Sequence, residues 1–321
     1  MDLIKAVLES EYASKLNLRP LAPVLNVCQA AFDGYGYCYV AEACGCLLMF
    51  FPYVPHCVPE TGTAYVDRYY YASQSVYRAK SELLRFARGF FPEADTYMGS
   101  YKALVRSAGI GASLYNSLIY IKPFGTFFCM EVIDLKTGAS QNRGGQELLP
   151  EEPRDTDECL ICGRCSKSCP AGALLPGTPP SERFVREKCI RQKQFEDADP
   201  HDPSNVIRGN RLLGCTECQL ACPLNRGVAA KIKRPSAEYY EMFDLDTLAK
   251  ACVTPGFKKS RYAEVFGYNY MKPRRILGHV LVAMANDGFE KHRAAVEECL
   301  EKGNPAFRDV LEAFLVNSEC V

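Results

Sequence analysis

Residues 158–170 read ECLICGRCSKSCP, and residues 209–226 read GNRLLGCTECQLACPLNR. The two stretches share one spacing of cysteines, C-x2-C-x2-C-x3-C-P in the first and C-x2-C-x3-C-P in the second. Between positions 158 and 226 the chain holds eight cysteines among many glycines, prolines and asparagines. Such a segment has too few apolar side chains to build a core of its own, so a bound group must take the place of that core.

The first spacing is typical of bacterial ferredoxins, in which three thiolates with two residues between neighbours wrap one 4Fe-4S cubane and the fourth ligates a second cluster. The second copy lacks its first cysteine, and the best candidate for it is Cys189, which lies upstream in a loop. The ferredoxin rule exchanges the last cysteine of each copy between two sets of four ligands. One set is Cys159, Cys162, Cys165 and Cys222, and the other is Cys169, Cys189, Cys215 and Cys218.

Two structural zinc sites are the alternative, because paired C-x2-C motifs also suit zinc. Zinc does not require two Cys-Pro endings or an interlocked repeat, so the spacing favours two 4Fe-4S clusters and one-electron transport. Nine further cysteines lie outside both copies. Cys44 and Cys46, which we place on one face of a strand, could form a third metal site with His56 and Cys57. The interpretation that we favour is that these nine are small buried hydrophobes.

The whole chain has an ordinary globular composition. Its 321 residues are 48% hydrophobic and 24% charged, which excludes a disordered chain and a coiled-coil rod. The seventeen cysteines are an odd number in a chain of this length, so a disulfide framework is a poor explanation for them. Residues 1–5 do not resemble a signal peptide, and the most apolar stretch, residues 44–51, is too short to span a bilayer. We therefore expect a cytoplasmic protein with no membrane partner.

The texture of the sequence predicts an α+β protein with three domains. Residues 1–153 are expected to form an α/β domain, residues 154–228 a ferredoxin-like domain with two clusters, and residues 229–321 a helical domain. Within the helical domain, apolar residues recur at helical spacing in three sets. Breaks rich in Gly, Asn, Asp and Pro at 286–288 and 303–305 separate these sets, so stacked antiparallel helices are expected.

The periodicity of apolar residues also predicts individual elements of the first domain. Residues 3–16 and 76–87 are expected to be helical, and the second of these helices is amphipathic. The strands expected at 117–121 and 126–133 should be joined by a turn at 122–125. The polar residues 136–157 should form a linker or covering loop. Strands are expected at 45–53, 117–121 and 126–133.

Residues 209–226 closely resemble the second cluster segment of epoxyqueuosine reductases, which are cobalamin-dependent iron–sulfur enzymes that complete the queuosine modification of tRNA. The resemblance is more specific than a ferredoxin repeat, because cluster ligation does not demand the frame G-N-R-x-x-G-C-x-x-C-Q. Asp95-Thr96 falls where that family carries an Asp-Thr or Asp-Ser pair. The resemblance extends more loosely over about residues 65–317, with weaker matches at 102–111, 116–119, 125–128 and 274–280.

The resemblance implies a cobalamin-type N-terminal domain, a double-cluster module and a HEAT-like helical tail. It implies that Asp95 is the proton donor and that Gly109, Gly111 and Asn116 belong to the cobalamin-binding segment. An external flavodoxin or ferredoxin would supply the electrons. Each assignment has a structural alternative: Asp95 could be a surface turn residue, and the glycines could end a helix. Tyr69–Tyr71 could stack on a flat cofactor or simply pack.

A local basic region offers a contact with tRNA. Residues 227–275 carry ten Lys and Arg against five Asp and Glu, whereas residues 276–321 are acidic. A solvated surface is the alternative explanation for such a region. The basic residues proposed to contact tRNA are Lys231, Lys233, Arg234, Lys258, Lys259 and Arg261.

The sequence therefore predicts an iron–sulfur oxidoreductase that passes electrons through two 4Fe-4S clusters to a corrinoid. This corrinoid would reduce epoxyqueuosine in tRNA or a related substrate. The chain departs from the family where Leu114-Tyr115 replaces a Gly-Lys pair, and residues 68–72 show no Arg-Asp-Tyr-His stretch. These departures favour the alternative, an electron-transfer protein without catalysis or a partner subunit that reduces a corrinoid.

Overall fold

The computed structural model describes most of the chain from residue 38 onward. The described residues are 6–7, 9–10, 18–20, 38–71, 73–122, 124–137, 159, 161–179, 181–198, 202–267 and 272–317. Most of the helix predicted over 3–16, most of the linker predicted over 136–157 and the domain boundary predicted at 153 lie outside these residues.

The N-terminal part is built on a five-stranded sheet. Its strand β3 spans Cys46–Pro52 and is buried along its whole length, because β2 and β8 flank it and side chains cover both faces. A strand in this position needs apolar residues at every position rather than alternate ones, and the buried strand predicted over 45–53 is therefore confirmed. The strand order is β1 (Leu18–Pro20), β2 (Cys38–Ala43), β3, β8 (Phe128–Asp134), β5 (Asp95–Thr96).

The described strands of this sheet are mainly antiparallel. Only β1 and β2 run parallel, whereas β2–β3, β3–β8 and β8–β5 are antiparallel. The turn at Cys44-Gly45 joins β2 directly to β3 and leaves no room for a helical crossover. The α/β arrangement predicted for residues 1–153 is therefore wrong for these strands, whereas the expected mixture of helices and strands is confirmed. Cys44 lies in this turn and not, as expected, on a strand face with Cys46.

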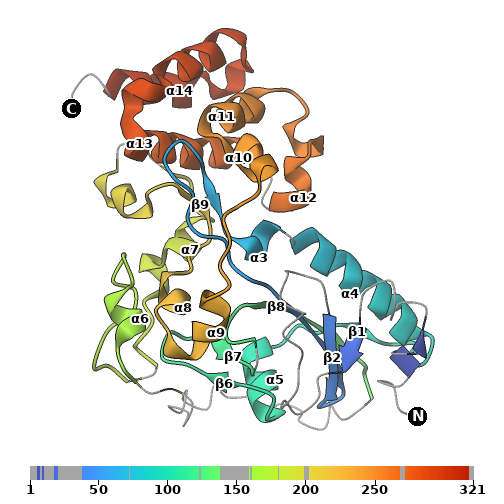
Figure 1. The fold of residues 1–321 in the computed structure, drawn as a ribbon. Helices are drawn as coiled ribbons and strands as arrows, with labels where there is room; N and C mark the ends of the chain where they lie inside the picture. Colours follow the sequence, from blue (N-terminus) through green and yellow to red (C-terminus); the bar gives the residue numbers. More distant parts are fainter. Residues whose placement is uncertain are drawn as a thin grey trace.

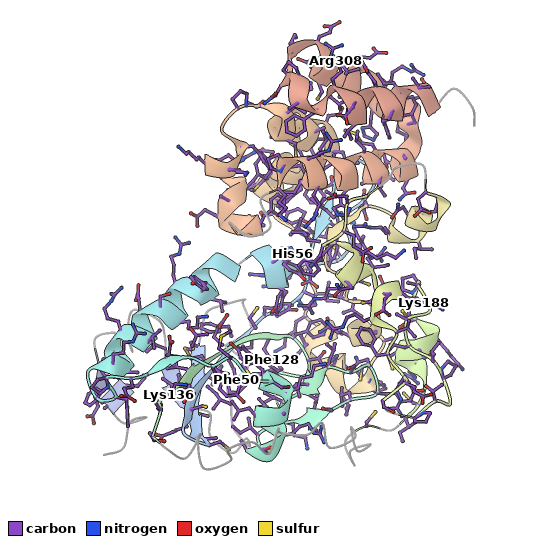
Figure 2. The ribbon with its side chains drawn as sticks, turned by 180° about the vertical axis from the view of Figure 1, so that it is seen from behind. Phe50, His56, Phe128, Lys136, Lys188 and Arg308 are labelled. Carbon is purple, nitrogen blue, oxygen red and sulfur yellow. The ribbon has the colours of Figure 1, made fainter. Side chains whose placement is uncertain are left out.

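The helix α4 (Ser73–Arg88) covers the sheet and confirms the amphipathic helix predicted over 76–87 (Figure 1). Its apolar stripe joins the same hydrophobic core as Phe50 and the other inward residues of β3. Lys80 on the helix forms an ion pair with Glu131 on β8, with 2.9 Å between Nζ and Oε2. The rings of Phe50 and Phe128 meet edge to face across two strands at 5.8 Å (Figure 2). The residues of the stripe are Val76, Ala79, Leu83 and Ala87.

The two later strands of this part lie in different sheets. The segment predicted over 117–121 contributes β7 (Ile119–Tyr120), which pairs with β6 (Ala112–Ser113) after the helix α5 (Tyr101–Ser107). The predicted turn is present, since the Ile121 amide donates to the Gly125 carbonyl at 2.9 Å. The chain then enters the main sheet through β8, so the turn connects two sheets rather than forming one hairpin.

The cysteine-rich segment consists of short helices around one short strand. This strand, β9 (Arg211–Leu213), pairs in parallel with β4 (Tyr65–Val66) from the N-terminal half of the chain. Its helices are α6 (Arg164–Lys167), α7 (Ile190–Lys193), α8 (Glu217–Leu220) and α9 (Arg226–Ala229), with 3-10 turns η2 (Arg186–Lys188), η3 (Pro203–Arg208) and η4 (Pro223–Asn225).

The C-terminal part is helical and lies above the rest in Figure 1. Both predicted breaks are present: Gly288 interrupts the long helix with a non-helical conformation, and Gly303 ends it. A HEAT-like arrangement of these helices stays a prediction. No helix in the described part of the chain is long and apolar enough to cross a membrane. The helices are α10 (Ala237–Phe243), α11 (Leu245–Val253), α12 (Tyr262–Phe266), α13 (Pro273–Lys302) and α14 (Arg308–Asn317), with the 3-10 turns η5 (Phe257–Lys259) and η6 (Pro305–Phe307).

A buried polar network joins the cysteine-rich segment to the N-terminal part. Gln219 Nε2 donates to the carbonyl and to Oγ1 of Thr126, both at 2.9 Å. Asn225 accepts from the Thr126 amide at 2.9 Å and donates back to Thr126 Oγ1 at 2.9 Å. All three side chains are almost fully buried, so losing one partner would leave polar groups unsatisfied away from water.

This network leads to a stability prediction at Gly125. Its φ of +64° is left-handed, and a Cβ there would come within 2.2 Å of Asn225 Oδ1. We expect Gly125→Ala to destabilise the protein by about 1 kcal/mol from strain, plus roughly 1–3 kcal/mol from the displaced network. Gly177→Ala is the matched control, because Gly177 has a φ of +74° with open space around its Cβ position. Thermal unfolding should show a larger loss for G125A, and equal losses would contradict the prediction.

Candidate metal centre

The first cysteine run folds back on itself within a few residues. Ile161 and Gly163 both have positive φ, and together they curl the chain around the segment between Cys159 and Cys165. Gly163 caps the short helix α6, which carries Cys165. Cys169 follows the helix, and the Ala173 amide donates to its Sγ at 3.2 Å. The chain therefore presents three thiols on one side of the loop and sends the fourth onward.

The second run is assembled from three places in the segment. Cys189 stands between η2 and α7, Cys215 follows β9, and Cys218 lies on α8. Cys222 precedes η4, whose first residue is Pro223. The helices α6 and α8 lie side by side, and the hydroxyl of Ser168 at the end of α6 donates to the Glu217 carbonyl of α8 at 3.2 Å.

Two cavities open between these elements, and each is lined by four cysteines. The first has a volume of about 370 Å³ and the second about 620 Å³. The last cysteine of each run lines the cavity of the other run, as the ferredoxin rule predicts. The first cavity is lined by Cys159, Cys162, Cys165 and Cys222, and the second by Cys169, Cys189, Cys215 and Cys218.

The chemistry of these cavities suits a metal cluster. Burial raises the pKa of Cys165 and of Cys215 to about 11, and it also raises the pKa of Cys218 and Cys222. Such thiols ionise when bound metal supplies positive charge. Four thiolates around zinc would each lie about 2.3 Å from one point, and no group of three or more His, Cys, Asp or Glu in the described part of the chain is placed to hold a single metal ion. This placement favours a cluster over zinc.

Asn116 lies at the boundary between the two cavities and lines both of them. Its side chain is 5% exposed. Its Nδ2 donates to the carbonyl of Cys218 at 3.4 Å, and its Oδ1 accepts from the Leu118 amide at 3.2 Å. The residue predicted from the cobalamin-binding segment is thus packed against the cysteine sites, and its contact with a corrinoid stays a prediction.

Gly109 and Gly111 each have a structural reason to be glycine. Gly109 follows α5 with a φ of +66°, its amide donates to Arg106, and the Ile110 amide donates to Val105. This pair of bonds is the Schellman motif that ends a helix. A Cβ at Gly111 would lie 2.7 Å from the Tyr120 carbonyl, whereas the space beside Gly109 is open. The helix-ending alternative therefore accounts for Gly109, whereas close packing against Tyr120 accounts for Gly111. Only Gly109 leaves room for a ring to approach.

Asp95 lies at the surface of the N-terminal part. Its side chain is 64% exposed, and its Oδ1 lies 3.4 Å from Nη2 of Arg88. It stands on the edge strand β5 opposite Asp134. This is not the desolvated pocket that would favour a proton donor, and its position agrees with the alternative of a surface residue. The catalytic role of Asp95 stays a prediction.

Several residues at the cavities escaped the sequence analysis. Tyr115, which was noted only as a departure from a family pattern, lines the first cavity, and the guanidinium of Arg183 stacks on its ring at 3.6 Å. Arg191 lines the second cavity. The frame G-N-R-x-x-G-C-x-x-C-Q was the available signal, because its polar residues include Gln219 of the buried network. Asn210 of the same frame donates to the carbonyls of Pro59 and Thr63 at 3.1 and 2.8 Å.

The predicted tRNA contacts lie on separate short segments. Lys258 and Lys259 are exposed on η5, and Arg261 follows just before α12. Arg234 is 78% exposed and lies 3.4 Å from a carboxylate oxygen of Glu60. Of the remaining two, Lys231 is half-buried and Lys233 is exposed. Whether these residues act together in tRNA binding stays a prediction.

Residues 158–225 match the family described as 4Fe-4S double cluster binding domain, and the two cavities with four thiols each agree with that match. The chain is also similar in sequence to epoxyqueuosine reductases. It is 34% identical over 126 residues to the one from Francisella cf. novicida (strain Fx1), covering 39% of this chain and 32% of that protein. It is 33% identical over 135 residues to the one from Bacillus subtilis (strain 168), covering 41% and 31%.

These alignments span about a third of the length of the curated relatives. The fold is similar over a longer stretch. A structure of Bacillus subtilis epoxyqueuosine reductase, with its catalytic aspartate loop swung out of the active site, matches with a TM-score of 0.59 and 23% identity. An epoxyqueuosine reductase solved with an epoxyqueuosine-modified tRNA-Tyr stem loop matches with a TM-score of 0.59 and 22% identity. Each match covers 83% of this chain and 71% of the other.

The crossed cavities predict which cluster each cysteine serves. Cys222→Ser should remove the cluster of the first run, although Cys222 lies far from that run in the sequence, because the residue lines that cavity. Cys162→Ser should give the same spectrum, and Cys218→Ser should remove the other cluster. Iron content and electron paramagnetic resonance of anaerobically reconstituted variants would measure this. A C222S spectrum that matches C218S instead would contradict the exchange.

Proposed function

We propose that the chain is an iron–sulfur oxidoreductase that passes electrons through two 4Fe-4S clusters to a corrinoid, which reduces epoxyqueuosine in tRNA or a related substrate. The observation that carries the proposal is the crossing of Cys169 and Cys222 between two thiol-lined cavities. It is supported by the match to a double-cluster domain and by relatives named epoxyqueuosine reductase.

The residues of the chain divide the work between electron transfer and positioning. The eight thiolates would hold the clusters, which suit one-electron steps. Asn116 would fix the wall between them, since it lines both cavities and is bonded to the carbonyl of Cys218. When bound, a corrinoid would supply the low-valent metal chemistry that cleaves the carbon–oxygen bond. The open backbone face at Gly109 fits the approach of a flat ring, whereas Gly111 is closed by its own neighbours.

Electrons from an external flavodoxin or ferredoxin would enter at the first cluster. Cys162 is exposed, and the neighbouring Ile161 is an apolar side chain that is 50% exposed. A cluster ligand at the surface shortens the distance that an electron must travel from a docked donor. An exposed apolar residue beside it favours contact with a protein partner.

Asp95 would protonate the leaving oxygen once the bound substrate shields its carboxyl group from water. Its exposed position leaves it in water, whereas a bound tRNA would exclude that water and place the carboxyl against the reacting group. Lys258, Lys259 and Arg261 are exposed cations that suit phosphate contacts. The relative solved with a modified tRNA stem loop supports this choice of partner.

An electron-transfer protein without catalysis is the second candidate. The exposure of Asp95 favours it, because a residue at the surface with an arginine partner needs no catalytic role. The exposed surface at Ile161 and Cys162 serves this candidate equally well. The two candidates differ in whether the chain itself binds a corrinoid.

Corrinoid binding therefore tests the proposal directly. The anaerobically reconstituted full chain should bind cobalamin with a change in its visible absorbance and a defined stoichiometry. Substituting the open position with Gly109→Val should weaken binding by blocking the approach of the ring and by straining a left-handed residue. Gly177→Val, which places the same side chain at a left-handed glycine of a turn in the cysteine-rich segment, is the control. A clustered protein that binds no cobalamin would leave the electron carrier as the better function.

The role of Asp95 is tested by turnover. Asp95→Asn should lower kcat on an epoxyqueuosine-containing stem loop by about 100-fold or more, the usual contribution of a general acid, with iron content unchanged. Glu93→Gln removes the same charge from an exposed position on the preceding turn and should leave kcat near the wild-type value. If D95N and E93Q have equal activity, Asp95 is a surface residue without a catalytic role.

A further inference from the structure

A half-buried cation stands at the wall of the second cavity. Arg191 lies in the first turn of α7, two residues after Cys189, and lines the cavity with the thiols of that set. It is the only cationic side chain among the described residues of this lining, which is otherwise mostly apolar. Glu217, which borders the same cavity, is paired with Arg211. The charge of Arg191 therefore faces a space that four thiols surround.

Neutral aromatic groups hold the guanidinium in place. It lies over the ring of Tyr69 at 4.3 Å and beside the ring of Tyr70 at 5.6 Å. Its Nε donates to the Tyr70 hydroxyl at 3.0 Å. Aromatic faces stabilise a cation without neutralising it. Tyr69 and Tyr70, for which the sequence left open stacking on a cofactor or simple packing, thus form a cation clamp around Arg191.

The clamp is connected to a cysteine of the cavity. Gln194 is 2% exposed and donates to the same Tyr70 hydroxyl through Nε2. Its Oε1 accepts from the amide of Gly214 at 2.8 Å, and Gly214 immediately precedes Cys215. The position of the guanidinium and the position of a thiol are therefore set by one continuous set of buried hydrogen bonds.

One carboxyl group lies near the clamp. Asp67 is 4% exposed and accepts from the Tyr69 amide at 2.9 Å. Burial raises the pKa of Asp67, and the positive charge of Arg191 opposes that rise. The contacts of the guanidinium described above are with tyrosines, so its charge remains available to a group bound in the cavity. An arginine keeps its proton under all ordinary conditions.

We propose that the fixed positive charge of Arg191 raises the reduction potential of the cluster held by Cys169, Cys189, Cys215 and Cys218. The inference rests on the proposed function in that the cavity must hold a 4Fe-4S cluster. Reduction adds one negative charge to the cluster, and a nearby cation stabilises the reduced form more than the oxidised form. The apolar lining strengthens this effect because it lowers the local dielectric. Electrons that enter at the first cluster are thereby drawn to the second.

The test compares two substitutions that remove one positive charge each. Arg191→Gln should lower the midpoint potential of a single cluster by about 59 mV, which corresponds to a tenfold change in the equilibrium constant of a one-electron reduction. Lys188→Gln is the matched control, because Lys188 adjoins Cys189 but is exposed, so solvent screens its charge (Figure 2). Arg191→Lys keeps the charge and should keep most of the potential. Titrations monitored by electron paramagnetic resonance on the full, anaerobically reconstituted chain measure all three.

The outcomes separate this inference from the proposed function. Repeating the titration with R191Q in a C222S background, where the second cluster remains, should reproduce the shift. Both clusters present with unchanged potentials in R191Q would overturn the inference alone, as would equal shifts in R191Q and K188Q. A wild-type chain that assembles no clusters would overturn the proposed function. If R191Q assembles poorly, Tyr70→Phe removes the hydroxyl that fixes the guanidinium. It should also lower the potential of one cluster, and an unchanged potential would contradict the role.

Discussion

The crossing of two cysteines between two cavities is the constraint on which the rest of the structure depends. Cys169 and Cys222 each leave their own run and line the cavity of the other. This is possible only if α6 and α8 are held side by side, because neither run can complete its set of four thiols alone. Short helices of four residues have little stability of their own. The bound groups and the neighbouring parts of the chain must therefore keep them in register.

The neighbouring parts meet that need with buried polar contacts in addition to shared apolar packing. Thr126, Gln219 and Asn225 exchange hydrogen bonds at 2.7–2.9 Å across the joint, and all three are almost fully buried. Buried polar networks are directional and specify one arrangement when they are fully satisfied. They can thus place the second run with a precision that nonspecific apolar packing does not provide. This accounts for the part of the cysteine frame that cluster ligation leaves unexplained.

The helical tail is joined to the same region from the other side. Ala64, Val66 and Tyr70 from the N-terminal half pack in one hydrophobic core with Leu212, Leu213 and the tail helices. Tyr70 takes part in that core and also bonds Arg191 at the second cavity. The parts of the chain therefore converge on the double-cluster segment, and a change in tail packing can reach the cation clamp through a single side chain. Because the double-cluster segment has no large apolar core of its own, its contacts with the parts of the chain around it stabilise it.

The sequence alone determined the buried strand β3, the amphipathic helix α4 and the breaks at Gly288 and Gly303, and it predicted which cysteines line each cavity. These features follow from local spacing, periodicity and backbone preference, which a linear pattern carries. Only the tertiary structure decided the antiparallel order of the sheet, the separation of β7 from β8 and the surface position of Asp95. It also decided that Asn116 stands between the cavities and that Tyr69 and Tyr70 hold Arg191. The reason is physical: which strand pairs with which, and which polar groups become neighbours, depends on contacts between residues 60 to 124 positions apart. Neither local spacing nor residue type encodes such a meeting.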